Sequence, residues 1–463
     1  MKNLFSKFIA LSFVFFMVSA LSAGAMAQNK KDMKKAKDLV SQGDRSFNKR
    51  DYDGAIRKYS EAISLVGNYP YAHFWKGNAH YYLKQYDLAL EEINTAEAQG
   101  FTPLIDLYRI RWFLNYSQKN YDAALSDLNN GLQVEPANIS FKAGLGDVYY
   151  AKQSYRDAIN IYNEIVDKIP NNGNTYYSIA NSHYNLGETE AQKAAAEKAI
   201  NNGTQFMSDA YFLVGKAYQK DRKYADAAVA YEKSINVKRD NYDTYRSLSD
   251  VYRNLNRFKD AIQITKKALE EFQRDGNLYT DLAWYYSLAD QHADAIGAAE
   301  IAISLLPEKY QAYTYLCRGL NDLKEYQKAI SACNNALRLN PEDGETNFYI
   351  GRAYEFSGNP GTATKFYKKA LTGLVEYTQR YPDFADGYYL LGNAYFSNGM
   401  KTKAIESYQK SLEFSPNFKK ARFNLGYVYI QNGDLASAEA QYQALLELDK
   451  ALAGRLKEAM PKK

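Results

Sequence analysis

Residues 385–417, ADGYYLLGNAYFSNGMKTKAIESYQKSLEFSPN, hold two helical patterns separated by a turn. The first pattern has the three- and four-residue spacing of one helix face, at Tyr388, Leu391, Gly392 and Tyr395. Asn398-Gly399 tolerate the left-handed backbone of a tight turn. A second helical face follows from Ala404, and Pro416 ends it because proline supplies no backbone N–H. The stretch predicts a helical hairpin whose small residues, Gly392 and Ala404, let the two helices approach closely.

The same pattern recurs along the chain with a period of about 34 residues. Gly392 and Gly426 are 34 residues apart, as are Ala404 and Ala438. Units are predicted to start at Ala36, Pro70, Ile105, Ile139, Gly173, Ser208, Tyr242, Gly276, Tyr310, Gly344, Ala385 and Lys419. Alanine stands at unit position 20 in eleven of the twelve units, and only Gln192 departs. A fixed period of this length indicates an array of stacked hairpins in which each unit contacts its neighbours.

This pattern resembles the tetratricopeptide repeat from about Ala36 to Asp449. Repeats 10 and 11 carry its small, aromatic and alanine positions at Gly351, Tyr354, Ala363, Tyr367, Ala370, Gly392, Tyr395, Ala404 and Tyr408. The resemblance implies an all-α, right-handed superhelical solenoid of about twelve hairpins. Residues 450–463 are predicted to form a C-terminal capping helix, because a solenoid must cover its last apolar face. The family mostly binds other proteins and shares no single ligand.

Three repeats depart from the pattern. Trp112 occupies a small-residue position in repeat 3, so its helices must splay or its register must slip by one residue. Repeat 5 has Gln192 and Ala196 where Ala and an aromatic residue are expected. Repeat 10 is seven residues longer near Leu371–Arg380, where the apolar stripe continues. About two extra helical turns are therefore predicted in its second helix.

The first 27 residues have the pattern of a secretory leader. Lys2 and Lys7 precede an apolar run, and Ala25-Met26-Ala27 is a small-x-small cleavage site. Cleavage would give an exported chain, most simply a periplasmic one, starting with a basic lead-in over residues 28–35. An uncleaved membrane anchor or a secreted protein is the alternative. Removing the two lysines lowers the net charge from +5 to about +3, which is too small to indicate a nucleic-acid partner.

No motif of catalysis or of cofactor or metal binding is found. The four histidines lack a second ligand at metal-binding spacing, and His80 and His183 occupy a packed position usually filled by tyrosine. We therefore expect a non-enzymatic protein without a cofactor. Cys317 and Cys333 face each other across the hairpin of repeat 9. A disulfide is permitted in an exported protein, and two buried thiols acting as apolar fillers are the alternative.

Positions 2, 5, 9 and 12 of each first helix are not needed for packing within a hairpin. In proteins that this chain resembles, these positions line the concave groove. The candidate groove residues are Phe74, Asn78, Tyr81, Asp147, Tyr150, Tyr177, Asn181, Tyr184, Arg246, Asp250, Arg253, Trp284, Phe348, Arg352, Tyr389, Asn393, Phe396, Phe423 and Tyr427. Exposed aromatic residues of this number indicate a partner, and packing between repeats is the alternative for about half of them.

Two kinds of partner fit this groove. The interleaved charges and the asparagine amides favour an extended or helical peptide, because an amide matches the C=O and N–H of a peptide unit. Lectin-like binding of an envelope polysaccharide is the alternative, since aromatic faces also stack on sugars, as is an accessory role in envelope polymer processing or secretion. The clamp with which some family members hold a C-terminal carboxylate is incomplete, because Phe74, Tyr177 and Tyr389 occupy its lysine position.

Overall fold

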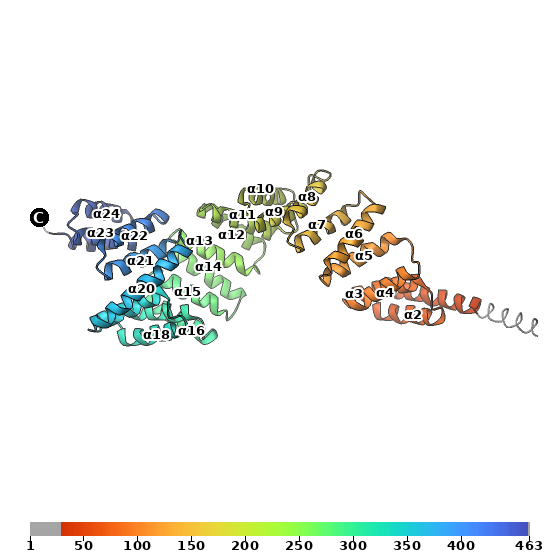
Figure 1. The fold of residues 1–463 in the computed structure, drawn as a ribbon, viewed down its shortest axis with the longest axis horizontal. Helices are drawn as coiled ribbons and strands as arrows, with labels where there is room; N and C mark the ends of the chain where they lie inside the picture. Colours follow the sequence, from red (N-terminus) through yellow and green to blue (C-terminus); the bar gives the residue numbers. More distant parts are fainter. Residues whose placement is uncertain (1–28, 462–463) are drawn as a thin grey trace, which may run out of the picture. The chain divides into compact units, whose positions relative to one another are not determined.

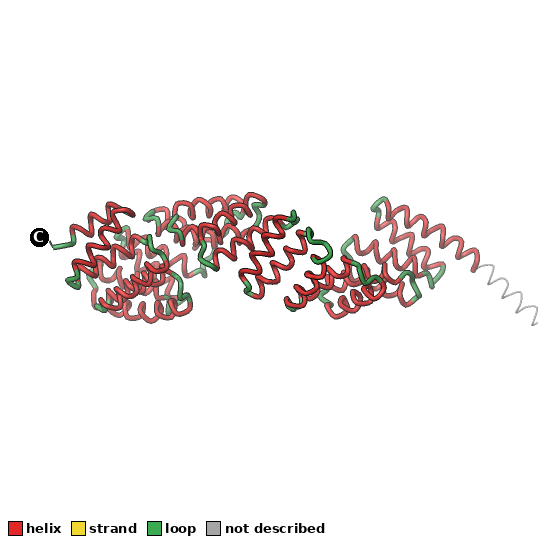
Figure 2. Tube along the Cα trace, turned by 90° about the horizontal axis from the view of Figure 1, so that it is seen from above, coloured by secondary structure: helices red, strands yellow, loops and turns green. Residues whose placement is uncertain are grey.

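The computed structural model describes residues 29–461, and within this range the chain folds into helices joined by short turns, without a β-strand. The predicted leader, residues 1–27, lies outside the described residues. Contacts divide the chain into two compact units, an N-terminal unit ending at Gln205 and a C-terminal unit starting at Phe206. In each unit, consecutive helices pack against one another as a tandem array of hairpins (Figures 1 and 2). The predicted all-α solenoid class is confirmed.

The N-terminal unit starts with a helix over residues 29–48, which includes most of the basic lead-in. It continues with α2 (Tyr52–Leu65), α3 (Pro70–Tyr82), α4 (Tyr86–Ala98), α5 (Leu104–Ser117), α6 (Tyr121–Val134), α7 (Ile139–Ala151), α8 (Tyr155–Val166), α9 (Gly173–Leu186) and α10 (Thr189–Asn201). From α3 on, the odd-numbered helices are the first helices of repeats, except for the final helix of the chain.

The C-terminal unit contains the remaining seven hairpins and a final helix. These are α11 (Met207–Lys220), α12 (Tyr224–Val237), α13 (Tyr242–Asn254), α14 (Phe258–Glu271), α15 (Gly276–Leu288), α16 (His292–Leu305), α17 (Tyr310–Asp322), α18 (Tyr326–Leu339), α19 (Gly344–Phe356), α20 (Pro360–Arg380), α21 (Ala385–Ser397), α22 (Lys401–Phe414), α23 (Lys419–Gln431), α24 (Leu435–Leu448) and α25 (Lys450–Glu458). Leu456 of α25 packs with Leu445 of α24, next to the partly buried Phe423 of α23.

Every hairpin turns at the same position. Residue 15 of each of the twelve repeats has a positive φ, which is the left-handed region. Glycine, which enters this region without steric cost, supplies it in four repeats, for example at Gly399 with φ 76°. The other eight use a longer polar residue, such as Lys84 with φ 60°. The left-handed turn residue is therefore fixed by its position in the repeat and does not require glycine.

The small residue at position 8 makes room for an aromatic ring. A Cβ added to Gly392 would lie 2.5 Å from the ring of Tyr408, and one added to Gly215 would lie 2.5 Å from the ring of Tyr231. Both tyrosines are at position 24 and are almost completely buried. The glycine therefore lets a buried tyrosine lie between the two helices, which explains why position 8 is small where position 24 is tyrosine.

The insertion in repeat 10 lengthens its second helix, as the sequence predicts. Helix α20 has 21 residues, whereas the other second helices have 12 to 14. Its packing on α19 is close, since a Cβ added to Gly373 would lie 2.3 Å from the carbonyl oxygen of Glu342. The last turns of α20 carry Tyr377, and the loop to α21 carries Tyr381 and Phe384. These added aromatic residues belong to the site described below.

In repeat 3, helix α5 starts at Leu104, one residue before the predicted unit start. Trp112 is directed towards the next repeat, where a Cβ added to Gly144 would lie 3.0 Å from its ring. Among residues 29–461, no helix is both long and apolar enough to cross a membrane.

Candidate functional site

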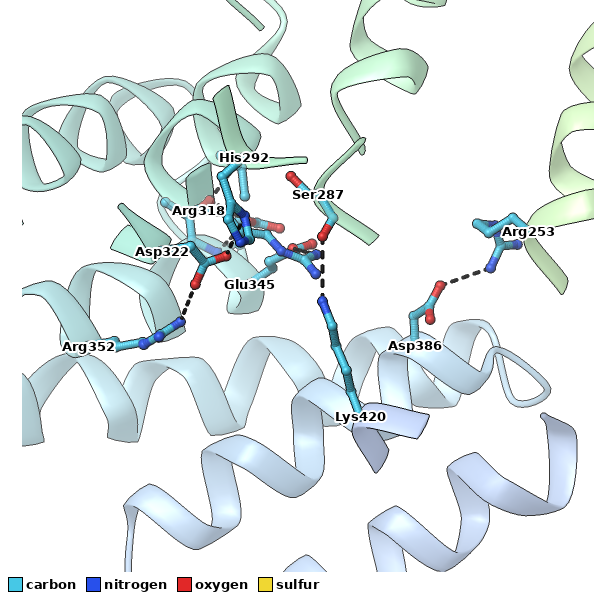
Figure 3. A network of polar contacts seen from close by, with 12 residues as sticks. Arg253, Ser287, His292, Arg318, Asp322, Glu345, Arg352, Asp386 and Lys420 are labelled. Atoms are coloured by element: carbon cyan, nitrogen blue, oxygen red, sulfur yellow. Dashed lines mark hydrogen bonds and ion pairs between the residues drawn. The ribbon is translucent and has the colours of Figure 1, made fainter. Parts of the chain in front are cut away.

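Polar contacts join the early repeats of the C-terminal unit to its late repeats. The partners come from repeats 6 to 8 on one side and from repeats 11 and 12, or the loop before them, on the other. The pairs are Arg222 with Asp383 at 3.2 Å, Arg253 with Asp386 at 2.9 Å, Asn256 with Ser415 at 2.8 Å and Lys420 with Asp290 at 2.6 Å. Three of these pairs span 133 to 161 residues of sequence. We call this set of contacts the closure seam, and Figure 3 shows its ion pair between Arg253 and Asp386.

Arg253 is the most enclosed charge of the closure seam. Its side chain is 8% exposed, and its guanidinium lies 4.7 Å from the centre of the Trp284 ring and 4.6 Å from that of Phe384. The carboxylate of Asp386, itself 14% exposed, accepts a hydrogen bond from it. Asp250 is a second carboxylate at 3.7 Å. Two aromatic rings and two carboxylates thus lie around a single guanidinium, an arrangement that stabilises a cation through ring quadrupoles and through charge.

A cavity of about 430 Å³ lies inside this closed part of the C-terminal unit. It is lined by the first helices α15, α17, α19 and α21 and by the insertion in α20. Its aromatic wall consists of Trp284, Tyr310, Tyr315, Tyr377, Tyr381, Phe384 and Tyr389. The rings of Trp284 and Tyr315 are parallel within 1°. We call this space the inner cavity; its volume is in the range of small-ligand sites, about 300–1,000 Å³.

One buried ion pair forms part of the cavity wall. Arg318 of α17 is 6% exposed and donates to Oε1 of Glu345 in α19 across 3.4 Å (Figure 3). Burial raises the pKa of Glu345 to about 7; Arg318 opposes this rise, and Asp343 and Asp386 add to it. Burial also raises the pKa of Asp343. The cavity therefore holds carboxyl groups whose charge is incompletely balanced by their neighbours.

The structure brings two predicted groove residues, Trp284 and Tyr389, to the inner cavity. Two predicted arginines lie outside its lining, in ion pairs with adjacent helices. Arg246 contacts Asp281 at 2.9 Å, and burial raises the pKa of that carboxyl to about 6. Arg352 contacts Asp322 at 2.9 Å, as Figure 3 shows.

Four predicted groove residues are buried, so their assignment to an open groove is wrong. Phe74 is 5% exposed and stacks on Phe101, 4.1 Å between ring centres. Asn78 is 6% exposed and donates to the carbonyl of Phe74 in its own helix. Phe348, 7% exposed, packs against neighbouring tyrosines. The fourth, Arg253, is held in the closure seam. Phe74 and Arg253 are covered by the loop residues Phe101 and Phe384, which the single-hairpin pattern does not reveal.

Position 9 has a structural role that the pattern also missed. Asp147 accepts a hydrogen bond from the Tyr162 hydroxyl at 2.7 Å, and Asn393 accepts one from Tyr408 at 2.8 Å. Asp44 and Tyr59 repeat the arrangement in repeat 1. In each case an Asp or Asn at position 9 satisfies the hydroxyl of a buried tyrosine at position 24. The co-occurrence of these two residue types in one repeat is the sequence signal that could have shown it.

In the N-terminal unit, tyrosine recurs at position 12 of four consecutive repeats, as Tyr81, Tyr116, Tyr150 and Tyr184. Tyr184 is 39% exposed, and the other three are partly exposed. Tyr81 contacts the Phe113 ring edge, and the Tyr150 hydroxyl accepts a hydrogen bond from Asn185 of the next repeat. Tyr177 and Asn181 of α9 are partly exposed beside this row. These residues remain candidates for partner contact.

The remaining predicted residues lie in the C-terminal unit. Asp250 is 3.7 Å from Arg253. Phe396 contacts Tyr427, which is 37% exposed. Phe423 is covered by Arg455 of the last helix, 5.1 Å from the ring centre.

Several cavity residues were missing from the prediction. Arg318 occupies position 9, and Glu345 and Asp386 occupy position 2, so the rule that selects Trp284 would also have selected them. Tyr377 and Tyr381 come from the insertion and the loop after it, outside the repeat pattern. No repeat-based rule could have found them.

Cys317 and Cys333 form a disulfide that joins α17 to α18, in the repeat that also contributes Arg318 to the inner cavity. Among the described residues, no group of three or more His, Cys, Asp or Glu side chains could hold a metal ion. His73 and His183 each contact one carboxylate, that of Glu92 or Glu188.

Comparison with known families gives five matches within the repeat region. Sequence models described as tetratricopeptide repeat match residues 116–190, 212–277, 385–418 and 407–440, and a model described as TPR repeat matches residues 43–84. The matches fall in both compact units.

Individual relatives align over shorter stretches. The small glutamine-rich tetratricopeptide repeat-containing protein 2 of Saccharomyces cerevisiae is 29% identical over 127 residues, which are 27% of this chain and 36% of that protein. Its namesake from Mycosarcoma maydis is 28% identical over 115 residues, 25% of this chain and 32% of that protein. The chain thus spans about a third of the length of these curated relatives.

Solved structures also match parts of the chain. The crystal structure of MamA protein is 27% identical, with a TM-score of 0.33, and the alignment covers 38% of this chain and 94% of that one. A tetratricopeptide repeat protein from Parabacteroides merdae ATCC 43184 is 13% identical, with a TM-score of 0.44, and covers 57% of this chain and 97% of that one.

Proposed function

Because the chain belongs to the tetratricopeptide repeat family, we propose that it is a non-enzymatic scaffold that binds an extended or helical peptide segment of a partner protein. The inner cavity is the observation that carries this proposal. It combines seven aromatic side chains with a buried arginine and a mostly buried glutamate. Aromatic and arginine side chains in desolvated pockets typically dominate the energy of protein interfaces. The partly exposed tyrosines of the N-terminal unit offer a second surface of the same chemistry.

We further propose that the protein acts in the cell envelope, most simply in the periplasm. The pattern of residues 1–27 supports export, although those residues lie outside the described part of the chain. The disulfide between Cys317 and Cys333 also supports it, because disulfides persist mainly in oxidising compartments. Mass spectrometry of the protein recovered from a soluble envelope fraction tests this step. A chain starting at Gln28 is expected, and an intact Met1 would contradict cleavage.

The binding proposal is tested by using the chain from Gln28 as bait in an envelope extract. We expect specific retention of one or a few proteins. The variant Tyr177→Ala/Asn181→Ala should retain them at least about tenfold less well, because losing one anchor of about 2 kcal/mol exceeds the ~1.4 kcal/mol of a tenfold change. Its helicity by circular dichroism should stay nearly unchanged, since both side chains are partly exposed.

The matched control is Asn129→Ala/Val134→Ala, which alters two exposed residues of the second helix α6. This control should retain the partners as the unaltered chain does. Equal retention by the Tyr177 and Asn181 variant would contradict the placement of a binding surface on α9. Retention of envelope polysaccharide without protein would favour the lectin-like alternative and overturn the scaffold proposal.

A further inference from the structure

We propose that the inner cavity receives an arginine side chain of the partner segment, with its guanidinium between the aromatic wall and the carboxylate of Glu345. This inference rests on the proposed scaffold function and specifies the chemistry of the partner. The three observations that carry it are the charge balance of the lining, a guanidinium already bound in the cavity wall, and unpaired polar atoms beside the free space.

The charged residues that line the cavity are mostly acidic. Two are cations, Arg318 and Arg380, and five are carboxylic acids, Glu342, Asp343, Glu345, Glu376 and Asp386. When Arg253 is added as the partner of Asp386, carboxylic acids still outnumber cations by five to three. An incoming cation would correct this imbalance, whereas an incoming carboxylate would increase it.

The cavity wall shows how these residues hold a guanidinium. Trp284, Phe384 and Asp386 all line the cavity, and all three contact Arg253. The planar guanidinium suits this arrangement, because it stacks on aromatic faces and donates to a carboxylate at the same time. The adjoining part of the cavity offers the same groups. The Tyr315 ring stacks on Trp284, 6.1 Å between ring centres, the Tyr377 ring lies 5.8 Å from that of Phe384, and Glu345 supplies a carboxylate.

Two polar atoms in this second set lack a partner. Arg318 donates to Oε1 of Glu345, and the other oxygen, Oε2, has no partner among residues 29–461. The Tyr315 hydroxyl likewise has no hydrogen-bond partner in the described part of the chain, although its ring stacks on Trp284. An arginine between these groups could donate to both oxygens. Lysine would fit less well, since an ammonium is a compact point charge without a planar face.

The experiment is a calorimetric titration of the full chain with two blocked amino acids, acetyl-arginine amide and acetyl-citrulline amide. Citrulline has nearly the same shape as arginine but is neutral. We expect saturable binding of the arginine probe and binding of the citrulline probe that is weaker by about tenfold or more, because a desolvated charge-assisted contact is worth at least that factor. Trp284 emission, measured in a Trp75→Phe/Trp112→Phe background, should change on binding of the arginine probe.

Two variants test whether the arginine probe binds in the inner cavity. Glu345→Gln keeps the shape of the side chain and removes its charge, so it should weaken arginine binding by about tenfold. Tyr315→Phe removes only the unpaired hydroxyl and should weaken it by a smaller factor. Glu447→Gln, at an exposed carboxylate of repeat 12, is the control and should bind as the unaltered chain does. Unchanged helicity in all three variants shows that folding is intact.

The inference is overturned if the arginine probe does not bind, if the citrulline probe binds equally well, or if Glu345→Gln and Glu447→Gln behave alike. These outcomes are separable from failure of the proposed function. A chain that still captures partner proteins but ignores the arginine probe refutes only the arginine inference. A chain that binds the arginine probe but captures no protein refutes the scaffold proposal.

Discussion

The ion pair between Arg253 and Asp386 connects repeat 7 to repeat 11, so its removal tests whether the C-terminal unit depends on its closure seam. Both side chains are mostly buried, and their atoms approach to 2.9 Å. Removing one partner of a buried pair typically costs about 3–5 kcal/mol, because the other charge stays buried without compensation. We predict that Arg253→Met lies near the upper end, since it also removes the cation–π contacts with Trp284 and Phe384.

Asp386→Asn should destabilise the chain by an amount near the lower end of the range of about 3–5 kcal/mol. Arg253 then keeps both rings and retains Asp250 at 3.7 Å as a second carboxylate. The double variant Arg253→Met/Asp386→Asn should cost at least about 2 kcal/mol less than the sum of the single changes, because it leaves no unpaired charge. The measurement is urea unfolding followed by Trp284 emission in the Trp75→Phe/Trp112→Phe background, which reports on the side of the cavity next to Arg253.

Arg246→Met provides the matched control. Arg246 also pairs with a carboxylate at 2.9 Å, but its side chain is 44% exposed. Pairs that involve exposed side chains are usually worth about 1 kcal/mol or less. If Arg253→Met costs no more than Arg246→Met, or if the two single changes at the buried pair simply add, the closure seam does not stabilise the unit and the reasoning is refuted.

Three further predictions concern stability. Gly373→Ala should destabilise the chain by about 1–3 kcal/mol, because the added methyl group would overpack against backbone. Gly361→Ala on the same helix meets open space and should stabilise the chain by up to about 1 kcal/mol. Changes in the urea midpoint that have the same sign in both variants would refute this. Reducing the Cys317–Cys333 disulfide, which spans 16 residues, should lower stability by about 3 kcal/mol, and reductant should have no such effect on Cys317→Ala/Cys333→Ala. Because the folded state raises the pKa of Glu345 from 4.5 to about 7, stability should fall by up to about 3 kcal/mol as pH rises through this interval; Glu345→Gln should lose this part of the pH dependence in unfolding curves at pH ~5 and ~8.

The repeat architecture could be predicted because each hairpin depends on contacts within about one period. Gly392 and Tyr408 lie 16 residues apart, and their packing recurs wherever the same residue pair recurs. The longer α20 could be predicted for the same reason, since its apolar stripe continues through the insertion. Periodicity therefore encodes the hairpin and its immediate neighbours.

The candidate site could not be predicted as completely, because it depends on contacts that no period relates. The pattern of repeat 7 alone predicts that Arg253 lies in an open groove. Its burial depends on Trp284, on Phe384 of the loop after the insertion and on Asp386 of α21. The burial of Phe74 was missed for the same reason, because Phe101, which covers it, comes from the loop before the irregular repeat 3. The role of position 9 was missed for a different reason. Its polar side chain accepts a hydrogen bond from a tyrosine fifteen residues later, as Asp147 does from Tyr162.

The closure seam also changes how the C-terminal unit responds to mechanical tension. An array with contacts only between neighbours extends like a spring, and its hairpins detach one after another from an end. In the C-terminal unit, Arg222, Arg253 and Asn256 are tied to residues 133 to 161 positions further along. Tension applied across these ties loads several contacts in parallel, so the repeats between them yield as one block. We therefore expect this unit to keep its length under tension until these contacts break.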